Sequence, residues 1–264
     1  MSESATKLSL RISRRLSQHA FKNLLPLQAA AGVVSFTFDD APASACQTGA
    51  LILEQHGVRG SFYIAGGLTD ALEQGKPCHS KQDLLNLLEN GHELGCHGFS
   101  HVRCDTLTAV ALQRELDRNS AFLSQLGVDT TRLNFAYPFG AFAYNAKRIT
   151  SARFRSSRIT GGGTHIGLAD LNALKTHRLY DVAVDADDYE SLLARTAHNQ
   201  GWLIVNTHDV EQSPSRFGTT PQRLEQAIAA ALASGCQVLT MNAAIDYWSA
   251  AANQVAAERG RASV

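Results

Sequence analysis

The chain has 264 residues, of which 44% are hydrophobic and 18% charged, so it is long enough to bury a full core. Its 24 lysines and arginines balance 24 aspartates and glutamates. This balance disfavours nucleic acid as a partner, because no excess of positive charge attracts phosphate. No apolar run approaches the roughly 18 to 20 residues that cross a bilayer, which predicts a soluble protein.

The cysteines indicate a reducing compartment. They are odd in number, scattered, and without the CxxC spacing of a zinc or redox site: Cys46, Cys78, Cys96, Cys104 and Cys236. We therefore expect free thiols and a cytoplasmic location.

Residues 1–32 are interpreted as a basic N-terminal extension. Leu8, Ile12 and Leu16 recur at helical spacing among basic residues, which allows an amphipathic helix on a membrane surface. The alternative is a partly ordered leader without a membrane role. Arg14-Arg15 resembles a twin-arginine export signal, but polar residues interrupt the stretch that would have to be apolar, which disfavours export.

From Val33 onward, short apolar runs alternate with helix-like segments, a pattern typical of βα units around a parallel sheet. The sequence predicts strands at 33–38, 60–65, 93–96, 134–137, 202–207 and 236–240. It predicts helices at 45–55, 80–89, 108–126 and 221–235. Ser80 can cap its helix, and Gly57 and Gly91 can end the helices before them. We expect one domain over 33–250 and a tail over 251–264.

Asp39 and Asp40 follow directly after the first of these strands. In barrels and open α/β sheets, functional sites lie at the carboxyl ends of the strands. Adjacent side chains on an extended segment point to opposite sides, so one carboxylate can bind a cation while the other accepts a proton. The alternative is a pair of turn or cap aspartates.

His97 and His101 are four residues apart, a spacing that places two imidazoles on one face of a helical turn and suits a metal. Catalytic zinc takes three protein ligands and leaves a position for water, and Asp40 would complete this set. His92, His165 and His177 are interpreted as structural.

His208 ends the strand predicted at 202–207. Its reference pKa of about 6.5 suits a general acid near neutrality. The alternative is a strand-end histidine that only binds backbone.

Together these segments resemble the polysaccharide deacetylases, the NodB-homology or chitooligosaccharide deacetylase-like group of carbohydrate esterases. The resemblance runs from Val33 to Ile245 and is carried by four segments in order: Thr37–Asp40, Gly91–His101, Asn134–Gly140 and Val205–His208. It implies an α/β fold, a distorted (β/α) barrel with about seven parallel strands.

The resemblance also implies roles for single residues. Asp39 would be the base and His208 the acid, while Asp40, His97 and His101 would bind Zn²⁺ or another divalent ion such as Co²⁺ or Ni²⁺. The groove and the oxyanion contact would come from Tyr137, Pro138 and Phe139. The implied reaction removes an acetyl group, most simply N-acetyl, from a polysaccharide, an oligosaccharide or a lipid-linked sugar.

The sequence departs from the family pattern at the residues that support the base and the acid. Many members have an arginine where this chain has Ala136, so we expect Arg132 or a residue within 153–158 to orient Asp39. For the aspartate that pairs with the acid histidine we expect Asp181, with Asp185 as second choice.

Two other functions stay open. One is an amidohydrolase for a small non-sugar amide. The other is a carbohydrate-binding relative without turnover, which the complete acid, base and metal set disfavours and the missing arginine keeps open. The segments 66–79 and 156–170 are expected to form groove loops that select the sugar.

Overall fold

The computed structural model describes residues 13, 17, 19–73, 75–182 and 188–262. The predicted N-terminal amphipathic helix, the arginine pair and Asp185 lie outside these described residues.

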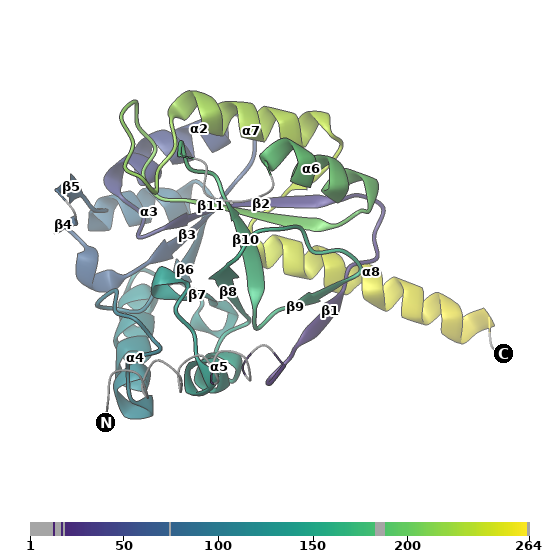
Figure 1. Ribbon diagram of the computed structural model, residues 1–264, viewed down its shortest axis with the longest axis horizontal. Helices are drawn as coiled ribbons and strands as arrows, with labels where there is room; N and C mark the ends of the chain where they lie inside the picture. The colour runs from purple at the N-terminus through teal and green to yellow at the C-terminus, as the bar shows by residue number, and fades with distance from the viewer. Residues whose placement is uncertain (1–12, 14–16, 18, 74, 183–187, 263–264) are drawn as a thin grey trace.

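Seven parallel strands close into a barrel at the centre of the molecule (Figure 1). In order around the ring they are β2 (Val33–Asp39), β3 (Ser61–Ile64), β6 (Glu93–Cys96), β7 (Asn134–Ala136), β8 (Ser156–Thr160), β10 (Leu174–Arg178) and β11 (Trp202–Thr207). Pairing of β11 with β2, from Trp202 beside Val33 to Thr207 beside Phe38, closes the ring. The predicted barrel is confirmed.

Two apolar clusters lie on either side of the barrel wall, because successive residues of a strand point to opposite faces. Trp202 and Ile204 belong to the inner cluster with Tyr63, while Leu203 and Val205 belong to the outer one. Both faces are covered, so every residue of β2 and β11 is buried, as expected for parallel strands.

Helices surround the ring and form the outer layer. They are η1 (Ala45–Gly49) with α2 (Ala50–Gln55), α3 (Lys81–Glu89), α4 (Ala109–Gln125), α5 (Tyr144–Ser151), α6 (Tyr189–His198), α7 (Pro221–Ala233) and α8 (Met241–Ala262). In Figure 1, α2, α6 and α7 lie above the barrel and α4 and α5 below it. Met241, Ile245 and Trp248 of α8 pack into the inner cluster beside Val33 and Trp202. This helix therefore fills the end of the barrel where β2 and β11 begin.

The smaller elements lie outside the ring. They are β1 (Leu24–Pro26), β4 (Leu72–Glu73), β5 (Lys76–Pro77), β9 (Leu168–Asp170), β12 (Gln237–Val238), η2 (Gly66–Leu68), η3 (Thr130–Arg132) and η4 (Pro138–Gly140). The strand predicted at 236–240 is only β12, which pairs with the first two residues of β2. Strand β1 precedes the expected boundary at residue 32 and pairs with β9, and α8 continues through the expected boundary at residue 250.

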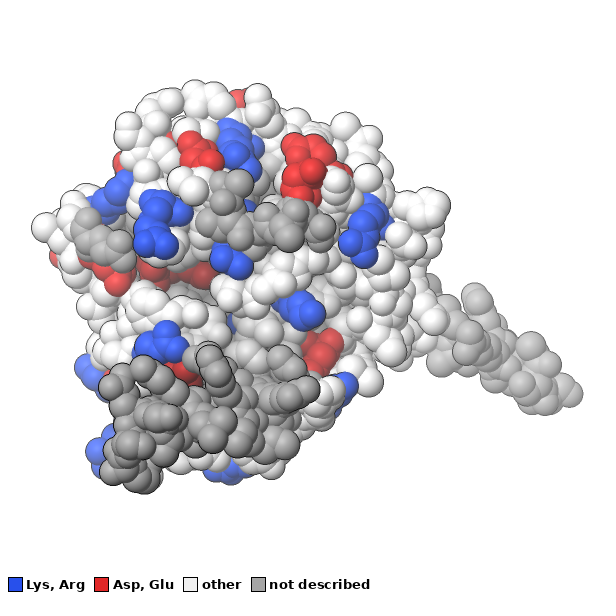
Figure 2. Space-filling view, viewed as in Figure 1, with Lys and Arg blue, Asp and Glu red and all other residues white. Residues whose placement is uncertain are grey.

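No helix among the described residues combines the length and the apolar character of a membrane span. On the face shown in Figure 2, lysine and arginine side chains are interspersed with aspartate and glutamate. Positive and negative side chains are therefore mixed across this face, as their equal numbers suggest.

The start of α3 provides a test of local stability. Ser80 Oγ accepts from the Asp83 N–H at 3.1 Å, and Asp83 Oδ2 accepts from the Ser80 N–H at 2.8 Å. Ser80→Ala should lower the free energy of unfolding by about 1 kcal/mol, the usual effect of losing such a cap. Urea unfolding measures this change, and Ser124→Ala on the exposed side of α4 should shift it by less than about 0.5 kcal/mol.

The same cap adds a dependence on pH. Partial burial acts to raise the pKa of Asp83, but hydrogen bonds from Ser80 and Gln47 outweigh it and hold that pKa below 3.8. Folding thus favours the charged carboxylate, so its contribution is present above the ordinary pKa and is lost as pH falls through the lowered one. The Ser80→Ala protein should lose less stability in acid than the wild type, and an equal loss would contradict this role for the capping box.

Candidate active site

The predicted acid and base come from neighbouring strands at one rim of the barrel. Asp39 is the last residue of β2, and His208 follows β11. Because Thr207 pairs with Phe38, the residues that follow these two enter the same space. The pairing of first and last barrel strands therefore brings together side chains that are far apart in the sequence.

His97 and His101 lie in a loop and not on a helical turn, so that part of the prediction is wrong. Gly98 and His101 both have positive φ, +72° and +49°, which turns the chain back before a helix can form. A side chain at position 98 would be strained in this conformation. The loop still brings the two imidazole rings to 5.2 Å between centroids.

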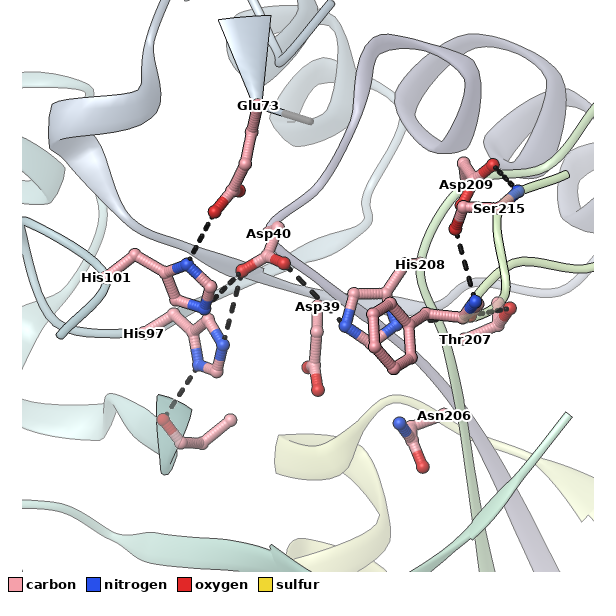
Figure 3. A network of polar contacts seen from close by, with 12 residues as sticks. Asp39, Asp40, Glu73, His97, His101, Asn206, Thr207, His208, Asp209 and Ser215 are labelled. Carbon is pink, nitrogen blue, oxygen red and sulfur yellow. Dashed lines mark hydrogen bonds and ion pairs between the residues drawn. The ribbon is translucent and has the colours of Figure 1, made fainter. Parts of the chain in front are cut away.

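Three ligand atoms converge where the metal was predicted. His97 Nε2 and His101 Nε2 lie 3.4 and 3.1 Å from Asp40 Oδ1, and Figure 3 shows both rings directed at this carboxylate. Ligand atoms at about 2.0–2.1 Å around a tetrahedral zinc lie about 3.3 Å from one another. The spacing of the three groups therefore fits such an ion.

The protons on the two imidazoles also fit a metal. His97 Nδ1 donates to the Ala136 carbonyl at 2.8 Å, and His101 Nδ1 donates to Glu73 Oε1 at 2.9 Å. Each neutral ring then carries its proton on Nδ1 and directs an Nε2 lone pair at Asp40. Asp40 Oδ1 is buried and has no hydrogen-bond partner. Three facing lone pairs repel one another unless a cation lies between them.

The surroundings favour the metal-binding forms of His97 and Asp40, whereas at His101 burial acts to lower the pKa, but the hydrogen bond to Glu73 and the charges of Asp40 and Glu73 outweigh it and raise the pKa above its ordinary value. Burial lowers the pKa of His97 to about 4 against the opposing charge of Asp40. Burial acts to raise the pKa of Asp40, but the charges of His97, His208 and His101 lower it further than burial raises it. Neutral imidazole and ionised carboxylate are the protonation states that metal ligands need.

Arg158 supplies the guanidinium that the segment Asn134–Gly140 lacks at Ala136. It lies on β8 directly beside Ala136 of β7, is buried inside the barrel and forms an ion pair with Asp39. Its guanidinium carbon lies 4.4 Å from the centre of the Tyr63 ring. Burial lowers the pKa of Arg158 to about 9, so the group remains charged at neutral pH.

Arg132, one of the two expected partners of Asp39, does not orient it, so this prediction is wrong. Its Nη2 donates to Asp246 Oδ2 at 2.6 Å on the exposed surface. Segment 153–158, the other choice, contains the arginine that contacts Asp39. Part of the expected groove loop 156–170 is thus the barrel strand β8.

His208 faces Asp40 from the side opposite the other two histidines (Figure 3). Its Nε2 lies 3.7 Å from Asp40 Oδ2, and its Nδ1 donates to the Phe217 carbonyl at 3.2 Å. Burial lowers the pKa of His208, although the charge of Asp40 acts in the other direction. A backbone carbonyl, and not the predicted carboxylate, therefore orients this ring.

Asp181 serves the start of α7 instead. Its Oδ1 accepts from the backbone N–H of Thr220 at 3.2 Å. The carboxylate next to His208 in the chain is Asp209, which Lys76 Nζ and the Ser215 N–H each hold at 2.7 Å.

In the segment Asn134–Gly140, some residues lie in the core and one lines the cleft. Tyr137 is buried and its hydroxyl bonds to Thr150, so its predicted contact with substrate is wrong, and Pro138 is buried too. Phe139 is 59% exposed, has φ +60° and stacks on His101 at 4.6 Å. With Asp39, Asp40 and His208, it lines a cleft of about 330 Å³.

Two further residues support the site and were not singled out from the sequence. Glu73 binds His101, and the buried His79 contacts the backbone carbonyls of Asp40 and Ala41 at 3.1 Å each. Neither has a motif or a spacing that marks it. The three histidines interpreted as structural lie outside the cleft lining.

A closed barrel of seven parallel strands is also the fold of the family 4 carbohydrate esterases. Residues 28–154, just under half of the chain, match the family model described as Polysaccharide deacetylase, a range that includes Asp39, Asp40, His97 and His101. This match confirms the resemblance to the polysaccharide deacetylases that the sequence indicated.

Solved structures share the fold at low sequence identity. The Xyl-CE4 domain of a multidomain xylanase from the hindgut metagenome of Trinervitermes trinervoides is 21% identical, with 80% of this chain and 88% of that one covered and a TM-score of 0.55. PdaA of Bacillus subtilis, a family 4 carbohydrate esterase, is 18% identical, with 87% and 86% covered and a TM-score of 0.55.

A CE4 family pseudoenzyme from Bacillus anthracis is also similar, at 16% identity, with 83% of this chain and 67% of that one covered and a TM-score of 0.56. No curated protein matches the chain. At these identities the structural likeness shows the fold, and the function of this chain depends on its own site.

Proposed function

We propose that this protein is a metal-dependent hydrolase that removes acetyl groups, most simply N-acetyl, from a carbohydrate. The match to the polysaccharide deacetylase family model supports deacetylation of a carbohydrate. The observation that carries the proposal is the convergence of two Nε2 lone pairs on the unpartnered, buried Asp40 Oδ1. Asp39 and His208 lie at the same cleft.

The residues around the cleft divide the work of hydrolysis. A divalent ion held by Asp40, His97 and His101 would supply a Lewis acid and lower the pKa of water from 15.7 to about 7. Asp39, paired with Arg158, accepts the proton of the attacking water. His208 donates a proton to the departing amine, and we assign the oxyanion contact to the backbone at Phe139.

The cleft also bears on the substrate. Its volume of about 330 Å³ lies at the lower end of the range for small-molecule sites, which suits one sugar residue and its acyl group. Phe139 offers an exposed aromatic face at the edge, and such faces pack well against apolar surfaces of ligands. A short or lipid-linked sugar is the substrate that the cytoplasmic location proposed below would favour.

Removal of the metal tests the proposal directly. Chelation should abolish acetate release from an acetylated oligosaccharide, and added Zn²⁺ or Co²⁺ should restore it, because the Lewis acid and the acidified water are both lost with the ion. Acetate is measured with an enzyme-coupled assay. Full activity in metal-stripped protein would contradict the mechanism.

The same assay separates the alternatives. A non-sugar amide hydrolysed faster than every acetylated sugar would favour the amidohydrolase. Sugar binding without acetate release, in protein shown to contain metal, would favour the non-catalytic relative. The ion pair of Arg158 with Asp39 removes the missing arginine as a reason to expect that outcome.

We also propose a cytoplasmic location, which the five buried free thiols support. Contact of the basic N-terminus with a membrane surface stays a prediction.

A further inference from the structure

A short hairpin lies beside the candidate metal site. Strand β4 pairs antiparallel with β5, and Glu73 lies directly opposite Lys76. The hairpin is tied at its base, since the Cys78 N–H donates to the Ala71 carbonyl and the Asp70 N–H donates to the His79 carbonyl, both at 2.9 Å. The backbone that carries these two charged residues is therefore held at the edge of the rim.

Glu73 faces the metal site. Figure 3 shows its carboxylate directed at the far side of the His101 ring, away from Asp40. Its Oε1 accepts from His101 Nδ1 at 2.9 Å, while His101 Nε2 lies 3.1 Å from Asp40 Oδ1. An ionised carboxylate can only accept, so this contact places the ring proton on Nδ1. The Nε2 lone pair is left for a ligand.

Lys76 anchors the other side of the hairpin. Its Nζ donates to Asp209 Oδ2 at 2.7 Å and also pairs with Glu211. Asp209 is buried and follows His208 in the chain. The hairpin thus joins the loop of a metal-binding histidine to the loop of the acid histidine.

We propose that Glu73 is a positioning residue for the metal centre, which holds His101 in the tautomer and the ring orientation that bind a divalent ion. The proposal rests on the metal site assigned above and adds a residue that is neither a ligand nor in contact with substrate. Partners of this kind typically change metal affinity by about 10–100-fold. The ring of His97 is oriented by a backbone carbonyl, that of Ala136. Of the two imidazoles, His101 is therefore the one whose orientation depends on a side chain that mutation can remove.

The chain offers a matched control. Glu54 accepts from His92 Nε2 at 3.1 Å, and the exposed fractions of the two side chains, 25% for Glu54 and 0% for His92, are close to the 28% and 8% of Glu73 and His101. His92 is outside the cleft. Glu54→Ala therefore removes a carboxylate–histidine contact of the same kind without touching the metal ligands.

The test is the Zn²⁺ affinity of the full chain, measured by competition with a chromophoric chelator. Glu73→Ala should weaken binding by about 10–100-fold, and Glu73→Gln, which keeps an acceptor without the charge, should weaken it less. Glu54→Ala should bind Zn²⁺ as the wild type does. Circular dichroism of the metal-free proteins checks that each variant is folded.

The outcomes distinguish this proposal from the proposed function. If Asp40→Asn binds Zn²⁺ as tightly as the wild type, the metal site itself is refuted. If Asp40→Asn loses Zn²⁺ while Glu73→Ala and Glu73→Gln keep wild-type affinity, the site stands and the role of Glu73 is overturned. The role is also overturned if Glu54→Ala weakens binding as much as Glu73→Ala.

Discussion

Asp39→Asn is expected to lower kcat by about 10²–10⁴-fold, the usual contribution of a general base, while Zn²⁺ stays bound. Asparagine has nearly the same shape as aspartate but cannot take a proton from water. The metal ligands Asp40, His97 and His101 are unchanged, so the loss belongs to proton transfer. Acetate release gives kcat, and elemental analysis of the purified protein gives the bound zinc.

An exposed ion pair supplies the control for this prediction. Asp117 pairs with Arg153 on the surface, with 66% of its side chain exposed. Asp117→Asn should leave both turnover and zinc content unchanged. A near-normal kcat in Asp39→Asn would remove Asp39 from the role of base.

The second large effect is expected at Arg158. Arg158→Ala leaves the buried carboxylate of Asp39 without its partner, and breaking a buried pair in this way typically costs about 3–5 kcal/mol. We expect lower stability and a loss of turnover comparable to that of Asp39→Asn. Thermal unfolding and acetate release measure the two effects.

A swap between neighbouring strands makes this prediction specific. Ala136 and Arg158 are register partners on β7 and β8, and neighbouring strands lie about 4.8 Å apart. Ala136→Arg should therefore restore part of the activity of Arg158→Ala, because a guanidinium from the next strand can reach the same carboxylate. In the protein that keeps Arg158, Ala136→Arg should lower stability, since a second guanidinium overfills the barrel.

The four proteins form a double-mutant cycle that isolates the coupling between the two positions. If the double variant is folded and no more active than Arg158→Ala, the position of the guanidinium is not interchangeable. Wild-type turnover in Arg158→Ala would show that Asp39 needs no partner.

The sequence predicted the positions of the active-site residues well where a reactive side chain follows a recognisable strand. Asp39 and His208 end apolar runs that are buried on both faces, and such runs are recognisable without a structure. Strands β8 and β10 were missed because their sequences, Ser-Ser-Arg-Ile-Thr and Leu-Lys-Thr-His-Arg, lack a clear apolar pattern. In β8, Ser156 bonds to Asn134 and Arg158 pairs with Asp39, and only the closed ring shows these contacts.

Other differences arise from contacts between distant segments. The spacing of His97 and His101 suggested a helical turn, but the left-handed conformations at Gly98 and His101 make a loop of it. Tyr137 was expected in the groove, but its hydroxyl forms a hydrogen bond with Thr150 in the core. Glu73 lies in a strand of two residues, too short for any periodicity to reveal.

The pairing of β2 with β11, which closes the barrel, determines when in synthesis the site is complete. The base arrives with the first strand of the ring and the acid with the last, and register pairs from Trp202 to Thr207 bring them together. A growing or truncated chain that stops before this seam holds the predicted metal ligands but lacks the proton donor. Turnover would thus report completion of the ring.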